Sequence, residues 1–115
     1  MTVGPEGEHA ARRYLEAKGL TFQAANVRAP FGEIDLVMGD PATGELVFVE
    51  VKTRHGTEFG TPEESVTKAK RVKLSKLVAW YCGRVRWSGQ VRLDVVGVLL
   101  RPGGEPQITH TAWVG

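Results

Sequence analysis

The chain has 115 residues, 42% of them hydrophobic and 24% charged, so it can bury one modest core and has no room for a second domain. Its net charge of +2 neither demands nor excludes a nucleic-acid partner. No stretch approaches the ~18 apolar residues that read as a membrane span, and the lone Cys82 cannot form an internal disulfide. We therefore expect one cytoplasmic domain over residues 1–115, with neither a secretion signal nor a membrane segment.

The first half of the chain predicts a helix followed by three strands. Pro5 and Gly19 bracket the helix, which carries an apolar stripe. A turn-rich connector over residues 39–45 joins the last two strands into a predicted hairpin. The predicted elements are a helix over Glu6–Lys18 and strands over Leu20–Arg28, Gly32–Met38 and Leu46–Lys52.

The second half predicts one long helix and two strands after an irregular connection. The acids Glu63 and Glu64 precede a run of basic residues, an order that suits the helix dipole. Asp94 is the one acid of its strand, where it could hold a lysine or arginine in place. The predicted segments are an irregular connection over Thr53–Pro62, a helix over Pro62–Tyr81 and strands over Val91–Leu100 and Ile108–Val114.

The strand ending at Lys52 sets two charges at the end of an apolar row. Side chains alternate between the faces of a strand, so Glu50 and Lys52 share a face with Leu46 and Phe48. Isolated charges are costly beside buried apolar groups, which favours a functional role for this pair. The alternative is an ordinary salt bridge on a solvated face of the sheet, because a three-residue pattern also arises by accident.

The preceding strand brings a second carboxylate toward the same place. Its alternation sets Glu33 and Asp35 on the side opposite the apolar residues Ile34, Leu36 and Met38. Pairing within the hairpin could bring Asp35 close to Glu50, and two facing carboxylates resist ionising unless a cation lies between them. Oxygen ligands of this kind suit Mg²⁺ or Mn²⁺, and a neighbouring ammonium suits phosphate chemistry. The combination is typical of phosphodiester hydrolysis.

These residues resemble the YraN family of small bacterial proteins, which are placed among the PD-(D/E)XK nucleases. The resemblance covers nearly the whole chain and rests on five blocks in the same order. The blocks are Gly7-Glu8 with Ala11, Tyr14 and Leu15; Gly32-Glu33-Ile34-Asp35-Leu36-Val37; Phe48-Val49-Glu50-Val51-Lys52-Thr53-Arg54; Phe59-Gly60-Thr61-Pro62 with Val66-Thr67 and Lys70; and Arg92-Leu93-Asp94-Val95-Val96. Five ordered blocks are far more specific than one triplet.

The resemblance implies a restriction-endonuclease-like α/β fold with an αβββαβ core, in which helices flank a mixed sheet. It implies that Asp35 and Glu50 hold the metal and that Lys52 is the catalytic lysine. It also suggests kinship with archaeal Holliday-junction resolvases, and Glu8 matches the position where their first helix adds a glutamate to the metal site. The chain departs from the superfamily's name at Ile34, where a proline would precede Asp35.

Four basic residues are candidates for contacts with DNA. Arg54 would share the face of Lys52 if the strand continued, and Lys70 interrupts the apolar stripe of the long helix. A lysine that points toward the sheet can extend its ammonium to the rim of the site. Arg71 and Lys73 either attract phosphate non-specifically or belong to a solvated face.

The sequence therefore predicts a Mg²⁺- or Mn²⁺-dependent endonuclease acting on DNA, by analogy with resolvases on branched or structured DNA. One active site per chain would require a homodimer to cut two strands symmetrically. The alternatives are a nucleic-acid-binding module in repair or recombination that cuts poorly, and an adaptor whose basic helix meets an acidic protein.

Overall fold

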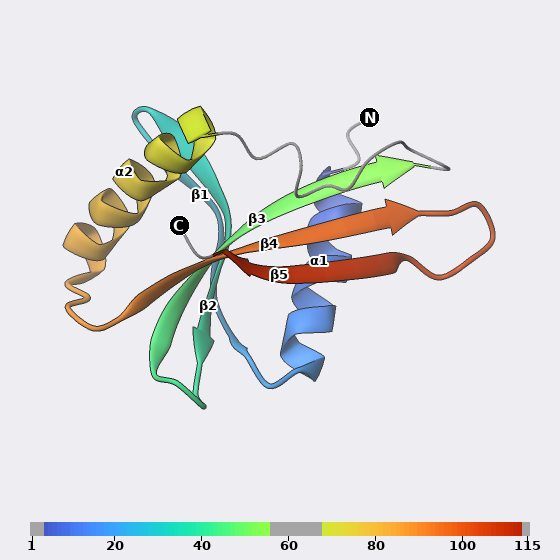
Figure 1. Cartoon of the computed structure of the whole chain (residues 1–115), viewed down its shortest axis with the longest axis horizontal. Helices are drawn as coiled ribbons and strands as arrows, with labels where there is room; N and C mark the ends of the chain where they lie inside the picture. Colours follow the sequence, from blue (N-terminus) through green and yellow to red (C-terminus); the bar gives the residue numbers. More distant parts are fainter. Residues whose placement is uncertain (1–3, 56–67, 114–115) are drawn as a thin grey trace.

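A computed structural model describes residues 4–55 and 68–113, apart from the side chains of Pro5 and Trp113 (Figure 1). This part of the chain forms two helices and one five-stranded sheet. The elements are α1 (Gly4–Ala17), β1 (Thr21–Ala29), β2 (Gly32–Asp40), β3 (Glu45–His55), α2 (Lys68–Val85), β4 (Val91–Leu100) and β5 (Gln107–Trp113).

The strands lie in the sheet in chain order, from β1 to β5. Neighbours are antiparallel except β3 and β4, which run parallel and are therefore joined by a long crossover that contains α2. The arrangement is a mixed sheet flanked by helices, which confirms the α/β fold class and is consistent with an αβββαβ core. The final strand β5 extends that core along the other side of β4.

The two helices cover opposite faces of the sheet (Figure 1). Alternate residues of β3 belong to different core clusters: Val47 and Val49 pack with α1, whereas Phe48 packs with α2. From the helices, Ala11 and Leu15 enter the first cluster and Leu74 and Leu77 enter the second. Neither described helix is long and apolar enough to cross a lipid bilayer.

The predicted elements are present, but several boundaries were wrong. Helix α1 begins at Gly4 rather than Glu6 and β2 ends at Asp40 rather than Met38, and the largest differences are in β3 and α2. Residues 53–55, predicted as irregular, continue β3 because β4 runs beside them and pairs His55 with Leu100. Helix α2 continues past the predicted end at Tyr81 to Val85. It is closed there by Arg86 in the left-handed region, with the Trp87 amide donating to the Cys82 carbonyl. The predicted helix start at residues 62–67 lies outside the described residues, as do the family blocks at 59–62 and 66–67.

The alternation of faces changes in the middle of β2. Ile34 packs in the α2 cluster, whereas Leu36 and Met38 pack in the α1 cluster, so the prediction that these three share a face was wrong. The register with β1 sets Asn26 opposite Asp35, and Asn26 has a left-handed backbone with φ of 52°. A left-handed residue interrupts the regular pleat, and in β1 Ala24 and Val27, on either side of Asn26, both pack in the α2 cluster. The change of face in both strands therefore falls beside Asp35.

Candidate functional site

The candidate site lies where β2 and β3 separate. Their backbone pairing ends at Leu36 and Val49, and the next residue of β2 is Asp35. Instead of a backbone carbonyl, the Oδ2 of Asp35 accepts the amide hydrogen of Val51 at 2.8 Å. The carboxylate therefore occupies the opening between the strands, next to the position where continued pairing would set Glu50. This agrees with the prediction that the hairpin brings Asp35 near Glu50.

Glu50 and Lys52 form an ion pair, with 3.1 Å between Lys52 Nζ and Glu50 Oε2. They follow Leu46 and Phe48 at alternate positions of β3, and those two residues are buried against α2. The side chains of Lys52 and Glu50 are 16% and 17% exposed. The pair is thus neither a solvated surface bridge nor sealed under the core, and it keeps a route to solvent.

The Asp35 carboxyl is held in an unfavourable place for a negative charge. Burial raises its pKa to about 7, the hydrogen bond from Val51 opposes that rise, and the charges of Glu50, Glu8 and Glu33 add to it. A cation between the carboxylates would relieve this repulsion. We call Glu8, Asp35, Glu50 and Lys52 the Asp35 cluster.

Helix α1 brings Glu8 to this cluster from the other face of the sheet. Gly7 makes the approach possible, because a Cβ there would overlap Thr53 Oγ1 and lie 3.0 Å from Thr53 Cβ. Burial raises the pKa of Glu8, a hydrogen bond from Asn26 opposes the rise, and the Glu33 charge adds to it. The structure therefore agrees with the prediction that Glu8 belongs near Asp35.

Asn26 and Glu33 are two neighbours of the cluster that the sequence alone did not single out. Asn26 holds Glu8 by its side chain and opposes Asp35 across β1 and β2. The type of residue was a signal, since asparagine tolerates a left-handed backbone better than most. Alternation set Glu33 on the same side of the strand as Asp35. That its charge raises the pKa of Asp35 and of Glu8 follows only from the fold. Glu33 also pairs with Arg28 at 3.4 Å near the surface.

Lys70 reaches the cluster from α2, as its interruption of the apolar stripe predicted. Its side chain contacts that of Lys52, and this neighbouring ammonium, followed by burial, lowers the pKa of Lys70. Burial opposes the charge of Lys52, but contacts with Lys70 and Glu50 outweigh it and raise the pKa of Lys52. The charge of Arg54 also lowers the pKa of Lys70. Arg54 Nη1 donates a hydrogen bond to the Thr53 carbonyl at 3.2 Å.

The other two basic candidates lie further along α2. Arg71 is half-buried on the helix turn of Lys70. Lys73 packs against the β1–β2 turn, since its Cε would be 3.0 Å from a Cβ at Gly32. Lys70 is therefore placed at the Asp35 cluster, whereas Lys73 lies about one helical turn away from it.

A second charged cluster crosses the sheet on the α1 face. Asp94, whose side chain is 0% exposed, receives Arg92 through two hydrogen bonds of 2.8 and 3.1 Å and contacts His110 at 2.7 Å. Arg92 Nη1 also donates to Asp40 at 3.0 Å and to Glu45 at 3.1 Å. These five residues, the Arg92 cluster, confirm that Asp94 holds an arginine in place. Every charge here has an opposite partner, which is typical of structural pairing.

The donor set fits an open magnesium site better than a closed one. Among the described residues, no three histidine, cysteine, aspartate or glutamate side chains converge closely enough to enclose a metal ion. Mg²⁺ needs only one or two carboxylates, because it retains water and binds substrate phosphate at its other positions. Asp35 and Glu50 could supply those carboxylates.

The chain is similar to a group of bacterial proteins of unassigned activity. The profile of the uncharacterised protein family UPF0102 matches residues 7–98. A UPF0102 protein of Beutenbergia cavernae is 45% identical over 98% of this chain and 95% of its own. A UPF0102 protein of Nocardia farcinica is 43% identical over 96% of this chain and 86% of its own. The match includes both strands and the helix that build the Asp35 cluster.

Proposed function

Since the chain belongs to the uncharacterised protein family UPF0102, whose name states no activity, we propose its function from the site: a metal-dependent endonuclease that hydrolyses phosphodiester bonds of DNA. The observation that carries the proposal is Asp35, a half-buried carboxyl set among three other acids and beside the Glu50–Lys52 ion pair. Repelling carboxylates next to an ammonium, open to solvent, are suited to a cation and a phosphate.

In this proposal Asp35 and Glu50 hold Mg²⁺ or Mn²⁺, and Glu8 adds or orients a ligand. When bound, the ion would neutralise charge on the phosphate and lower the pKa of a water. The hydrogen bond from the Val51 amide fixes the orientation of Asp35, leaving its other oxygen for the metal. Asn26 fixes Glu8 in the same way. The site is therefore oriented by contacts that do not depend on the ion.

Lys52 is proposed as the catalytic lysine, acting as an ammonium. Its pairing with Glu50 places the charge at the mouth of the site, where it can position the attacking water and offset charge developing on the phosphate. Lys70 and Arg54 extend this positive edge and are proposed to bind neighbouring phosphates. Arg71 and Lys73 would add phosphate contacts along α2.

The finer parts of the proposal rest on the resemblance to the YraN family and the PD-(D/E)XK nucleases. By that resemblance the substrate is branched or otherwise structured DNA in the cytoplasm. A homodimer would supply the second active site needed to cut two strands symmetrically.

A second candidate is a nucleic-acid-binding module that does not cut. Two observations favour it: every charged residue of α2 is basic, and no three metal-ligating side chains converge in the described part of the chain. Such a module would bind DNA through counterion release and leave the Asp35 cluster without a catalytic metal.

Cleavage and metal binding can be tested on the same variants. The purified protein is incubated with Mn²⁺ or Mg²⁺ and labelled linear, flap and four-way DNA, together with Glu50→Ala, Lys52→Ala and Asp35→Asn. We expect Mn²⁺ to raise the melting temperature of the wild type, corresponding to about 1.4 kcal/mol at roughly ten times Kd. Asp35→Asn and Glu50→Ala should lose this rise, whereas Lys52→Ala should keep it. All three variants should lose cleavage.

Glu16→Gln is the matched control, because it removes an exposed carboxylate that pairs with Arg12 on α1. It should keep both the Mn²⁺ effect and cleavage. Salt-sensitive DNA binding without cleavage in the wild type would support the binding module. Cleavage that survives in Lys52→Ala and Glu50→Ala would come from a contaminant or another site and would refute the proposal.

A further inference from the structure

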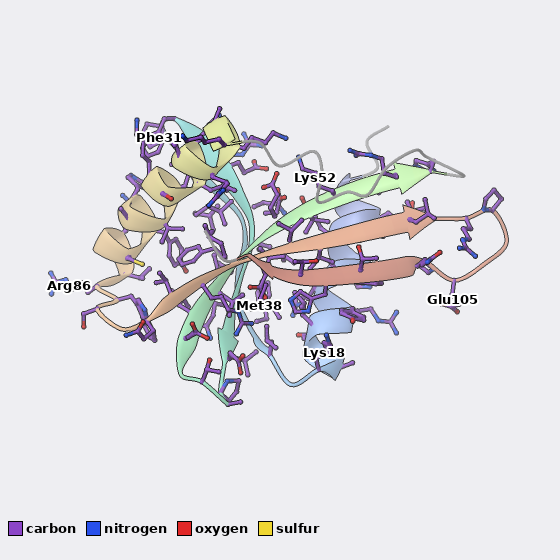
Figure 2. The ribbon with its side chains drawn as sticks, viewed as in Figure 1. Lys18, Phe31, Met38, Lys52, Arg86 and Glu105 are labelled. Carbon is purple, nitrogen blue, oxygen red and sulfur yellow. The ribbon has the colours of Figure 1, made fainter. Side chains whose placement is uncertain are left out.

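An exposed apolar surface lies at the N-terminal part of α2, outside the Asp35 cluster. Phe31, in the β1–β2 turn, is 44% exposed and Val72 is 51% exposed. Together with Ala69, Lys73 and Lys76 they line an open depression of about 480 Å³. We call these five residues the Phe31 patch. Figure 2 shows Phe31 beside the first turns of α2.

The core does not explain this surface. Helix α2 packs on the sheet through Leu74 and Leu77, and the positions 69, 72, 73 and 76 form a different stripe at helical spacing. Gly32 lets the β1–β2 turn approach α2 closely, since a Cβ there would be 3.3 Å from Leu77 Cδ1. The turn is thus held against the helix while the ring of Phe31 remains exposed to solvent.

The patch is apolar in its floor and positive at its rim. In the described part of the chain, Lys73 and Lys76 make no ion pair with a carboxylate, and no acidic residue lies in α2. The alkyl chain of Lys73 packs over Gly32, the residue after Phe31, and both Phe31 and Lys73 line the same depression. A flat apolar group joined to negative charge is the complementary ligand.

We propose that the Phe31 patch binds an unpaired base of DNA, with the ring of Phe31 stacked on the base and the flanking phosphates on Lys73 and Lys76. A nucleobase offers both the flat apolar face and the adjoining phosphates, and stacking on an aromatic ring is available only to a base that is not inside a duplex. The substrate class is therefore DNA in which unpaired bases adjoin a duplex. This inference rests on the proposed function and adds a preference to it.

The position of the patch relative to the Asp35 cluster supports this reading. Lys70, which contacts Lys52, lies about one helical turn before Lys73 on the same helix. A strand whose unpaired base stacks on Phe31 can therefore continue along the basic stripe toward Lys52. The phosphates near the junction would then face the carboxylates.

A second copy of the chain fits the patch less well. An isologous contact through this surface would bring Lys73 and Lys76 of both copies close together, and like charges that face each other across an interface oppose association. Among the residues whose side chains are described, the other exposed large apolar side chains are Val85 and Val91, which lie outside the patch.

The test compares two DNA ligands of equal length and charge, a fully paired duplex and a duplex with unpaired arms, by fluorescence anisotropy of the whole protein without divalent ions. We expect wild type to bind the forked duplex about tenfold more tightly. Phe31→Ala should abolish that preference and leave the affinity for paired duplex within about twofold, because its phosphate contacts persist. Phe31→Trp should retain the preference, and Val85→Ala, the control, should change neither affinity.

Abasic sites in the unpaired arms sharpen the test. Abasic sites should lower the affinity of wild type for the forked duplex as much as Phe31→Ala lowers it. They should not lower the affinity of Phe31→Ala further, since both changes remove the same stacking contact. If DNA binds but Phe31→Ala leaves the preference intact, the patch assignment is wrong and the proposed function stands. If the protein binds neither DNA, both fail. A dimer in sedimentation that Phe31→Ala dissociates would assign the patch to a second copy and overturn the inference.

Discussion

The two charged clusters of this protein lie on the same sheet and differ in how their charges are balanced. In the Arg92 cluster one guanidinium meets carboxylates from three strands, and His110 contacts the buried Asp94. In the Asp35 cluster several carboxylates share a single ammonium, that of Lys52, with Lys70 beside it. In the first cluster every carboxylate is hydrogen-bonded to Arg92 or His110, whereas in the second the hydrogen bond to Asp35 comes from the Val51 amide and not from a basic side chain.

The pKa values of the two aspartates express this difference. Burial would raise the pKa of Asp94, but the hydrogen bonds from His110 and Arg92 outweigh it and lower the pKa. Hydrogen bonding to Arg92 likewise lowers the pKa of Asp40. Burial raises the pKa of Asp35 to about 7, the hydrogen bond from Val51 does not outweigh it, and the charges of Glu50, Glu8 and Glu33 add to the rise. A buried carboxylate that the fold leaves uncompensated is a better candidate for a ligand site than one the fold neutralises.

The largest expected effect comes from removing the centre of the Arg92 cluster. Arg92→Met keeps the aliphatic bulk but leaves Asp94 buried without its main partner, together with Asp40 and Glu45. We expect a loss of about 3–5 kcal/mol in the free energy of unfolding, because buried Asp94 keeps only His110 while Asp40 and Glu45 lose their ion pairs. Urea unfolding at about pH 7 measures it.

Arg28→Met is the matched control for that prediction. It removes a guanidinium–carboxylate pair of 3.4 Å in which Arg28 is 85% exposed, so the loss should be under about 1 kcal/mol. A similar loss in both variants would show that the Arg92 cluster contributes no more than a surface pair. The two clusters would then not differ in how much their ion pairs contribute to the stability of the fold.

Asp35→Asn should increase the free energy of unfolding, and by less than Arg92→Met decreases it. At about pH 8 the wild type must hold Asp35 ionised in a place that disfavours the charge, so the amide should stabilise the protein by on the order of 2 kcal/mol. Asparagine can still accept the Val51 hydrogen bond. Urea unfolding without divalent ions, repeated from about pH 4 to about pH 8, measures the difference.

The sign follows from proton binding in the folded and unfolded states. The pKa of Asp35 is about 7 in the folded state and 3.8 for an ordinary aspartate, so between these pH values the folded state binds more protons than the unfolded state. Wild-type stability therefore decreases as pH rises through this window, and the advantage of Asp35→Asn should shrink toward zero at about pH 4. Asp94→Asn should destabilise at neutral pH, with a difference that narrows in acid. If Asp35→Asn destabilised the protein at about pH 8, the claim that the ionised Asp35 carboxylate destabilises the fold would be wrong.

Part of the site could be predicted from the sequence, from the alternation of side chains along strands and from the helical spacing of apolar residues. The two-residue spacing set Glu50 and Lys52 on the face of Phe48, and the register of the hairpin brought Asp35 toward Glu50. Lys70 was identified because it interrupts the apolar stripe of α2, where a lysine can extend its ammonium to the rim of the site. Each of these inferences uses a local rule that holds whatever the rest of the chain does.

The rest depended on backbone and long-range details that no local rule contains. The change of face at Asp35 follows from a left-handed Asn26 on the neighbouring strand, and most asparagines in strands keep the regular pleat. The partners of Arg92 lie 52 and 47 residues away, at Asp40 and Glu45. The packing of Gly7 on Thr53, which brings Glu8 to the site, likewise requires the placement of α1 on the sheet.

The smallest expected effects are the changes in the pKa of Asp35 when each neighbouring acid is replaced. Replacing each neighbour by its amide should lower the pKa of Asp35 in the order Glu50→Gln, Glu8→Gln, Glu33→Gln, because their charges act on Asp35 in that order. Glu33 is 41% exposed, so its replacement should change stability by under about 0.5 kcal/mol through solvent screening. Carbon-13 NMR titration of the Asp35 carboxyl resolves the order, with Glu16→Gln as the control that leaves it unchanged. If all three amides left the pKa of Asp35 near 7, burial alone would account for it, and the repulsion that invites a cation would be absent.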